Sequence, residues 1–379
     1  MNPWNRRRML LGGAAASLCV SGFDRAEVGM TTVPRAEAAM AGGGALGDGD
    51  DSGDGPSGRI DVHHHYTAPT WLSWAEEHGL ANRARLPWWA KWDLDSTMSM
   101  MNSLDIATSV FSPALFVESY QDDRQHRESI RIAHQAATDL LEARPGRFAF
   151  FVKLPLDHLE MASWALRHGL DELGGLGVSV FTHDARGRYL GDPVFDGLLA
   201  ELNERAAVIA LHPTDLPGGH PAKPAVPGIP TFVCDFPLDT TRAAINLIHR
   251  GTLDRFPNLS IILPHGGGFL PYIATRLEIS VPFMTPAFDV GRIRDYLRRF
   301  YYDTAGPMSP SATPSLVSAV DTERILYGSD WPAAAFEAIS DAGTELDRDP
   351  ALEPHQRHGI SRTNAIRLMP SLAGDRATG

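Results

Sequence analysis

The sequence contains very little cysteine. Only Cys19 and Cys234 occur in 379 residues, and Cys19 lies in an N-terminal segment that we expect to be removed on export. The mature chain would then keep a single cysteine, which excludes an internal disulfide and any metal site built from cysteine ligands. A metal ion in this protein must therefore be held by histidine and carboxylate groups.

Positive charge and long apolar runs are scarce as well. The formal net charge is −12 at pH 7, which argues against a nucleic-acid partner, because nucleic-acid-binding proteins carry a basic surface. The one extended apolar stretch, residues 9–23, is too short and too rich in glycine and alanine to span a bilayer comfortably. Hydrophobic residues make up 43% of the chain and charged residues 21%, proportions typical of a soluble globular protein.

The N-terminal segment resembles a twin-arginine export signal. Three consecutive arginines, residues 6–8, precede the apolar stretch, and "AEA" at residues 36–38 is a small-x-small cleavage site. We expect residues 1–38 to be a signal peptide and the mature protein to be periplasmic or extracellular, without a membrane anchor. A disordered basic tail is the alternative. Residues 39–58, rich in glycine and aspartate, are predicted to form a flexible linker.

From residue 59 onward, short apolar runs alternate with amphipathic helical stretches. Strands that are apolar on both faces are typical of a parallel sheet. Eight such strands, each followed by a helical segment, predict that residues 59–379 form a single-domain (β/α)8 TIM barrel. The predicted strands cover residues 59–64, 107–112, 147–154, 176–182, 207–212, 259–264, 300–304 and 324–329, and the predicted helices cover 122–143, 157–168, 193–205, 239–250, 269–280, 311–320 and 350–369.

Two longer segments do not fit a minimal barrel. Residues 70–96 contain five of the eight tryptophans, and residues 213–236 are rich in proline and glycine. Each segment follows a predicted strand that ends in histidine. Loops after the strands of a barrel lie on its catalytic face, so both segments are candidate walls of a substrate pocket. The alternative for the tryptophans, which are Trp71, Trp74, Trp88, Trp89 and Trp92, is that they only cap the barrel with apolar mass.

Polar residues stand at the carboxyl ends of several predicted strands. Strand 59–64 runs into "HHH", and the other three positions are His212, His265 and Asp330. They are too far apart in sequence to meet through a local turn, so only barrel closure could gather them. Because side chains of a strand alternate between its faces, we expect His63 and His65 to point the same way as Asp61, and His64 to point toward the helical layer as a structural residue.

Four of these residues form a candidate metal site. Two imidazoles from one strand can chelate a single cation, and His212 and Asp330 complete an N/N/N/O ligand set for His63 and His65. This set favours Zn²⁺, with Mn²⁺ also conceivable. Alone, an HxH pair is a weak signal, and the aspartate of "GSDWP" could be only a helix cap. The predicted strand 176–182 has no lysine to bridge two ions, and we expect Lys153 to be an ion-pair or surface residue, so a mononuclear site is predicted.

His265 has a different predicted role. It is followed by three glycines, which allow a tight turn and the close approach of a ligand. A histidine at the metal rim that is not needed as a ligand is a natural general acid or base, because its pKa lies near neutrality. The alternatives are a fifth metal ligand or a residue that only orients a ligand.

Whole motifs of the chain resemble the amidohydrolase superfamily, and within it the branch of aminocarboxymuconate-semialdehyde decarboxylase. The motifs are "DVHHHYTAP", "ALHPTD", "TTRAAINLIHRGTLDRFPNLSIILPHGGGFLPY", "FYYDTAG", "ILYGSDWP" and "NAIRL". The runs "HHHY", "YLGDP" and "DFPLDTTRA" are most similar to the 6-methylsalicylate decarboxylase-like members. The resemblance covers residues 59–369.

This resemblance implies a metal-dependent barrel, a homodimer and a non-oxidative decarboxylase. It implies metal ligands at His63, His65, His212 and Asp330 and a catalytic His265. Two positions depart from the pattern. Thr214 stands where the aminocarboxymuconate enzyme has tryptophan, and His63 stands where resorcylate-type enzymes have glutamate.

We therefore predict a metal-dependent carboxy-lyase that acts on a small aromatic or enoic carboxylic acid. The cation would act as Lewis acid and template, and His265 would assist protonation at the carbon that loses CO2. An arginine is expected to hold a remaining anionic group, and the candidate substrate contacts are Arg83, Arg85, Trp88 and Arg188. A hydrolase of an amide, ester or lactone is the alternative for the same mononuclear site, and a non-catalytic metal- or ligand-binding protein is a third.

Overall fold

A computed structural model describes residues 58–87, 90–114, 120–219, 224–306 and 308–373. The predicted signal peptide and all but the last residue of the predicted linker lie outside these residues. None of the described helices is long and apolar enough to cross a membrane.

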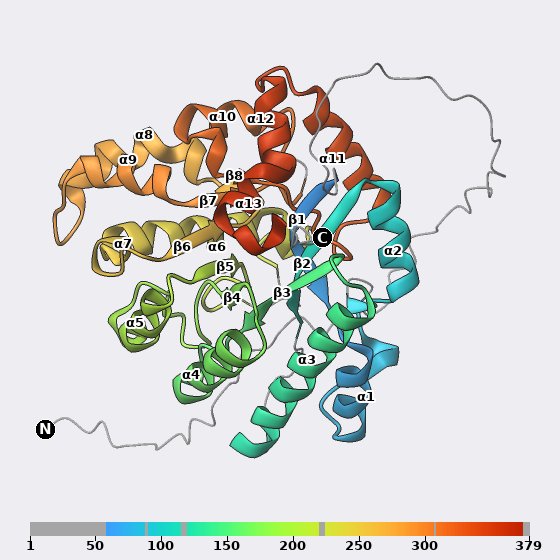
Figure 1. Cartoon of the computed structure of the whole chain (residues 1–379). Coiled ribbons are helices and arrows are strands. Elements are labelled where there is room, and N and C mark those ends of the chain that lie inside the picture. Colours follow the sequence, from blue (N-terminus) through green and yellow to red (C-terminus); the bar gives the residue numbers. More distant parts are fainter. Residues whose placement is uncertain (1–57, 88–89, 115–119, 220–223, 307, 374–379) are drawn as a thin grey trace, which may run out of the picture.

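Eight parallel strands follow one another around the sheet in sequence order (Figure 1). Hydrogen bonds between β1 and the segment after β8 close the circle: the amide of Val62 donates to the carbonyl oxygen of Tyr327 at 2.9 Å, and that of His65 to Trp331 at 2.7 Å. The predicted (β/α)8 barrel is therefore confirmed. The strands are β1 (Arg59–Tyr66), β2 (Ile106–Pro113), β3 (Phe148–Lys153), β4 (Gly177–Phe181), β5 (Val208–His212), β6 (Ser260–Leu263), β7 (Tyr301–Asp303) and β8 (Ile325–Leu326).

Helices surround the barrel (Figure 1). They are α1 (Pro69–Glu77), α2 (Leu94–Ser103), α3 (Asp123–Ala143), α4 (Leu159–Leu166), α5 (Asp196–Glu204), α6 (Thr231–His249), α7 (Thr252–Arg255), α8 (Leu270–Ser280), α9 (Val290–Arg299), α10 (Thr313–Ala319), α11 (Phe336–Arg348), α12 (Pro354–His358) and α13 (Asn364–Leu368). Two predictions are corrected here. Helix α6 starts inside the segment 213–236, with Pro237 in its second turn, and the predicted helix 350–369 is divided by a π-helical segment, Gly359–Thr363.

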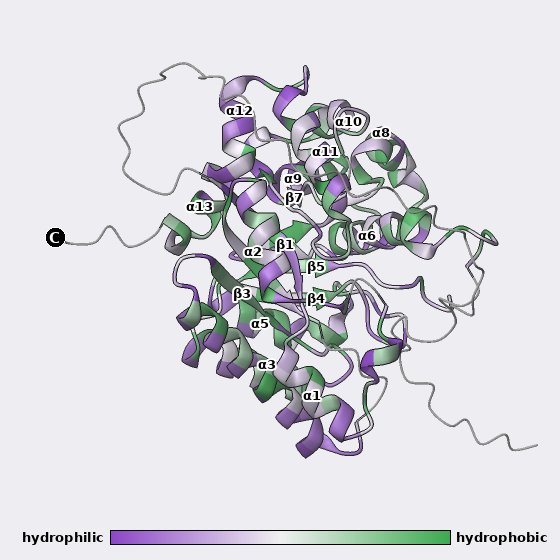
Figure 2. Cartoon of the chain, turned by 90° about the vertical axis from the view of Figure 1, so that its right-hand side faces the viewer, coloured by the Kyte–Doolittle hydropathy of each residue, from purple (hydrophilic) through white to green (hydrophobic). Residues whose placement is uncertain are grey.

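Apolar side chains form two layers. The larger layer lies between the strands and the helices. The smaller layer fills the barrel, and Ala365, Met369 and Leu372 from the C-terminal segment pack against it; its strand residues are Ile60, Val62, Val110, Ala149, Phe151, Val208, Ile262, Tyr301 and Leu326. In Figure 2, the residues along β3 and β5 are coloured as hydrophobic and those of α12 as hydrophilic. The amino-terminal end of the barrel is thus covered, which leaves the carboxyl ends of the strands for a site.

A bulge in β1 corrects one detail of the strand prediction. Asp61 pairs with Ser109 and His64 with Phe111, so the two residues between Asp61 and His64 oppose one residue of β2 and one extra residue is inserted. Val62 therefore packs inside the barrel, although it directly precedes His63, whose ring belongs to the central cluster of histidines. Asp61 lies with His64 on the other side, with Nδ1 of His64 3.5 Å from Oδ2 of Asp61. The prediction that Asp61 shares the face of His63 and His65 is wrong because simple alternation ends at the bulge.

The structural role predicted for His64 agrees with its surroundings. Its side chain is buried, and the indole nitrogen of Trp92 donates a hydrogen bond to its Nε2 at 3.3 Å. The same indole packs edge-on against Tyr66, with ring centroids 4.7 Å apart. His64 therefore anchors the tryptophan-rich segment to β1.

A pair of histidines, the buried His134 of α3 and His168 in the segment after α4, makes stability depend on pH. Nδ1 of His134 lies 2.9 Å from Nδ1 of His168, and burial followed by the charge of His168 lowers the pKa of His134 to about 3. The unfolded chain takes up a proton near pH 6.5, whereas the folded chain does not until about pH 3. This histidine therefore stabilises the fold above pH 6.5, and the contribution is lost as the pH falls toward 3.

We expect His134→Phe to flatten the dependence of the unfolding free energy on pH between 6.5 and 4, by at most about 1.4 kcal/mol per pH unit. Urea titrations at several pH values measure this slope. Replacement of the exposed His355 by asparagine is the control and should leave it unchanged. Equal slopes for wild type and His134→Phe would contradict the assignment.

Candidate metal centre

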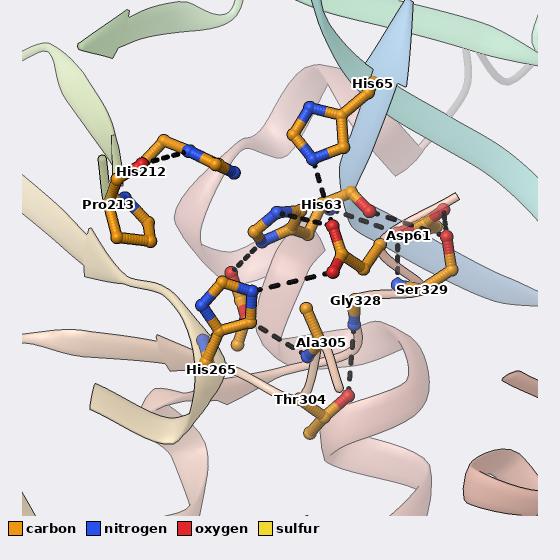
Figure 3. Close-up of polar contacts among 12 residues, drawn as sticks. Asp61, His63, His65, His212, Pro213, His265, Thr304, Ala305, Gly328 and Ser329 are labelled. Atoms are coloured by element: carbon orange, nitrogen blue, oxygen red, sulfur yellow. Dashed lines mark hydrogen bonds and ion pairs between the residues drawn. The ribbon is translucent and has the colours of Figure 1, made fainter. Parts of the chain in front are cut away.

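Four of the predicted residues meet at the carboxyl end of the barrel. One ligand atom from each of His63, His65, His212 and Asp330 lies within 4.8 Å of the others. Their side chains come from β1, from the end of β5 and from the segment after β8. Figure 3 shows the imidazoles of His63, His65 and His212 turned toward a common centre. Barrel closure therefore gathers the residues that the sequence leaves far apart.

The donor atoms of this cluster fit a divalent cation. Nδ1 of His63 is hydrogen-bonded to Asp303 at 2.8 Å, and its buried Nε2 lies 3.3 Å from Oδ1 of Asp330, another residue of the cluster. Nδ1 of His212 lies 2.7 Å from the carbonyl oxygen of Pro213, which leaves Nε2 for a ligand. Nε2 of His65 lies 3.0 Å from Oδ1 of Asp330. The cluster thus offers three imidazole nitrogens and one carboxylate oxygen, a ligand set that zinc and related ions prefer. Two of the imidazoles, those of His63 and His212, are also oriented by a hydrogen bond to their other nitrogen.

The charges of the cluster are compatible with metal binding. Burial raises the pKa of Asp330, but hydrogen bonds from His265, His63 and His65 outweigh it and hold that pKa well below its usual value. Burial, reinforced by His65 and His63, holds the pKa of His212 well below its usual value, so its lone pair is available. At His63, burial is outweighed by the charge of Asp303, and the pKa is raised. A cation must therefore displace a proton from His63 when it binds.

Asp303 is a site residue that the sequence reasoning missed. It ends β7, and its Oδ2 accepts the hydrogen bond from Nδ1 of His63. Its Oδ1 accepts bonds from the backbone amides of His265 at 2.9 Å and Ala305 at 3.1 Å. One carboxylate thus orients a metal ligand and fixes the backbone of the predicted catalytic residue. The available signal was an aspartate at the end of the predicted strand 300–304, inside the quoted motif "FYYDTAG".

His265 lies beside the ligand cluster and is not part of it. Its Nε2 is 3.7 Å from Oδ2 of Asp330, and its ring centroid is 5.1 Å from that of His63. Its backbone has a φ of 54°, and that of Asp330 has 62°, a left-handed conformation that is costly for residues with a side chain. Such conformations are retained where the position of a side chain matters, which agrees with functional roles for both.

The glycines after His265 serve the packing of the protein. Added Cβ atoms would lie 2.7 Å from Sδ of Met308 at Gly266, 2.8 Å from the ring of Tyr302 at Gly267, and 2.1 Å from the carbonyl oxygen of Pro237 at Gly268. The predicted tight turn is present. The space that was expected to admit a ligand is filled by β7, the segment after it and α6.

Three motifs from different parts of the chain meet at the buried carboxylate of Asp239 in α6. It accepts hydrogen bonds from the hydroxyl of Tyr189 at 2.8 Å and the backbone amide of Thr214 at 3.1 Å, and it is bonded to the hydroxyl of Thr182. Tyr189 belongs to "YLGDP", Thr214 to "ALHPTD" and Asp239 to "DFPLDTTRA", while Thr182 directly follows β4. Asp239 therefore fixes the loop that follows His212 against β4 and α6.

Two of the arginines predicted as substrate contacts already pair with acidic residues close in sequence. Arg83 pairs with Glu76, Nε to Oε2 at 3.1 Å, and Arg188 forms a close ion pair with Asp184. Arg85 is exposed. Trp88 and Trp89 lie outside the described residues. Trp71 is fully buried in the helical layer and donates to Ser129 at 2.8 Å, so it caps the barrel and forms no pocket wall.

Lys153 corrects another prediction. It ends β3, and Nζ lies 3.5 Å from the ring centroid of Phe181, at the end of β4. No ion pair joins it to a carboxylate among the described residues, and burial lowers its pKa to about 7. It is therefore neither an ion-pair residue nor a freely solvated one. Sequence reasoning missed it because a lysine after "FAFFV" gives no sign of which way it points.

Comparisons with known proteins identify the family of this chain and several of its relatives. The sequence profile of the amidohydrolase family matches residues 60–370. Decarboxylase macB of Penicillium terrestre is 33% identical over 74% of this chain and 86% of its own. 6-Methylsalicylic acid decarboxylase acuB of Aspergillus aculeatus is 30% identical over 85% and 98%. The structure of 2,6-dihydroxybenzoate decarboxylase in complex with 2,6-dihydroxybenzoate superposes with a TM-score of 0.70 and 25% identity, covering 83% of this chain and 99% of that one.

Proposed function

The chain belongs to the amidohydrolase family, and from this premise we propose that it is a metal-dependent carboxy-lyase of a small aromatic carboxylic acid. The observation that carries the proposal is the meeting of three histidines and Asp330 at the barrel mouth, with His265 beside them and not among them. Two of the named relatives are decarboxylases of a small aromatic acid, which supports this substrate class.

One divalent ion would be held by the clustered ligand residues, which are His63, His65, His212 and Asp330. When bound, the ion supplies a Lewis acid that binds and polarises the carboxylate and a neighbouring oxygen of the substrate. We propose zinc, because three imidazoles and one carboxylate are typical of that ion, and manganese is the alternative that metal analysis decides.

The residues of the chain then supply a proton and hold the geometry. Loss of CO2 from an aromatic acid breaks one C–C bond, leaves its electron pair on the ring carbon, and needs one proton at that carbon. His265 donates this proton, since it lies next to the ligand cluster with Nε2 directed at Asp330. Asp303 holds the backbone of His265 and the ring of His63, so the donor and the ligand cluster keep a fixed relation.

A substrate panel tests the function. The metal-loaded mature chain is incubated with hydroxybenzoic acids, 6-methylsalicylate among them, and with aryl esters and lactones. We expect CO2 release from at least one acid and loss of that activity after chelation. Hydrolysis of esters or lactones without CO2 release from any acid would contradict the proposal and favour a hydrolase.

We also propose that the protein is a homodimer. Support comes from large apolar side chains exposed on α6 and α8 and in the turn after α8, which are Phe232, Tyr272, Ile279 and Phe283. Light scattering should give twice the chain mass, and Ile279→Glu with Phe283→Glu should give the monomer. Phe336→Glu, at an exposed apolar residue of α11, is the control. A monomeric wild type would contradict the dimer.

Export through the twin-arginine signal is likewise a proposal. It is supported by the arginines at positions 6–8 and the apolar stretch that follows. Lysine replacements at these arginines should keep the chain in the cytoplasm of a bacterial host, and unchanged export would contradict the proposal.

A further inference from the structure

We propose that the ammonium group of Lys153 binds a second anionic oxygen of the substrate, so that the preferred substrate is an aromatic acid with a carboxylate or phenolate besides the carboxyl group that is lost. This inference rests on the proposed function, because it assigns the departing carboxylate to the metal ligands and His265. It gives Lys153 the role that sequence reasoning assigned to an arginine.

The position of Lys153 in the barrel directs its side chain into the mouth. Ala149 and Phe151, two and four residues earlier in β3, both belong to the apolar layer inside the barrel. Alternation along the strand turns Lys153 to the same side, one layer nearer the carboxyl end. His212 follows the interior residue Val208 on β5 in the same way. Lys153 and His212 therefore lie in the same layer of the interior.

Phe181 separates the lysine from the metal ligands. It ends β4, between β3 and β5, and pairs in register with His212. Its ring lies 3.5 Å from Nζ of Lys153 and 6.1 Å from the ring of His212. The carboxyl ends of three neighbouring strands thus present an ammonium, an aromatic face and a metal ligand in that order. An aromatic acid has the matching order of anionic substituent, ring and carboxylate.

The ammonium lacks a counter-ion within the described chain. It lies over the aromatic face of Phe181, and no carboxylate of the described residues lies within ion-pair distance. A desolvated charge without a counter-ion is unfavourable. An anion from the substrate supplies the missing charge, and its binding favours the protonated form of a group whose pKa burial has lowered to about 7.

The order of the three strands assigns Lys153 to the second group and not to the departing one. Phe181 ends β4, between Lys153 on β3 and His212 on β5, so the ring of an aromatic acid would lie between the ammonium and the metal ligands. The departing carboxylate then belongs to the metal ligands and His265, and the second acidic group belongs to Lys153.

Calorimetry with inert ligands tests the inference apart from catalysis. The metal-loaded protein is titrated with benzoate, 3-hydroxybenzoate, benzene-1,3-dicarboxylate and benzene-1,4-dicarboxylate. Wild type should bind at least one of the ligands with a second acidic group about 10- to 100-fold more tightly than benzoate. Lys153→Met should remove this preference and leave benzoate affinity and metal content unchanged. Lys153→Arg should keep most of it, and Lys91→Met, at an exposed lysine, should keep all of it.

Each outcome decides the inference. A preference for a dicarboxylate identifies the second group as a carboxylate, and a preference for 3-hydroxybenzoate identifies it as a phenolic oxygen. Equal affinity of wild type for all ligands, or a loss in Lys153→Met that is the same for benzoate, overturns it. CO2 release is measured separately. A Lys153-dependent preference without decarboxylation would refute the proposed function alone, whereas decarboxylation without that preference would refute this inference alone.

Discussion

Replacement of His265 by asparagine is expected to lower kcat for decarboxylation by about 10²- to 10⁴-fold, the usual contribution of a positioned general acid. Asparagine is close to histidine in size and polarity but carries no titratable proton. The backbone amide of residue 265 can still donate to Asp303, so the turn should persist. Steady-state kinetics on the metal-loaded protein measure the change.

Metal content is the control for this variant. His265 is not among the four clustered ligand residues, so His265→Asn should still bind one equivalent of metal. KM should change little, because the proton is needed in the reaction step and not for binding. Loss of metal together with activity would instead identify His265 as a ligand, and unchanged kcat would exclude it as the proton donor.

The second large effect concerns the two neighbouring histidines of β1. Replacement of His65 by alanine should abolish decarboxylation and reduce bound metal well below one equivalent, because it removes one of four ligands. Replacement of His64 by alanine should leave metal content intact and lower the melting temperature, because His64 is buried and bonded to Trp92. The pair is a matched test, since the two positions are adjacent.

Metal analysis by mass spectrometry and thermal melts with and without added metal separate these effects. Saturating metal should raise the melting temperature of His64→Ala as it does that of wild type, and should do so far less for His65→Ala. The opposite pattern, with metal lost in His64→Ala, would show that the bulge in β1 does not set the ligands as described.

Much of the site could be anticipated from the sequence because barrel geometry is simple. Residues at the carboxyl ends of parallel strands meet at one rim, so His63, His65, His212 and Asp330 could be grouped without coordinates. Strand alternation correctly placed His63 and His65 on one side of β1, but it also placed Asp61 there, which is wrong. The bulge between Asp61 and His64 interrupts the alternation, and nothing in "IDVHHHY" indicates it.

The residues that were missed depend on side-chain direction and on partners distant in sequence. The arginines chosen as anion binders are common surface cations, and Arg83 and Arg188 already pair with nearby acids. Lys153 was dismissed because its strand position alone did not show that Phe181 and the barrel interior surround it. Asp303 was visible at a strand end, but its two hydrogen-bond partners, His63 and His265, belong to other strands.

The most direct test of a metal-dependent carboxy-lyase is decarboxylation of the best acid substrate in D2O, with the product examined by NMR and the gas by mass spectrometry. The account predicts one equivalent of CO2 and one deuterium, located at the ring carbon that carried the carboxyl group, with both products lost after chelation and in His265→Asn. Metal-loaded protein that releases no CO2 from any aromatic acid while it hydrolyses an ester or lactone would contradict it.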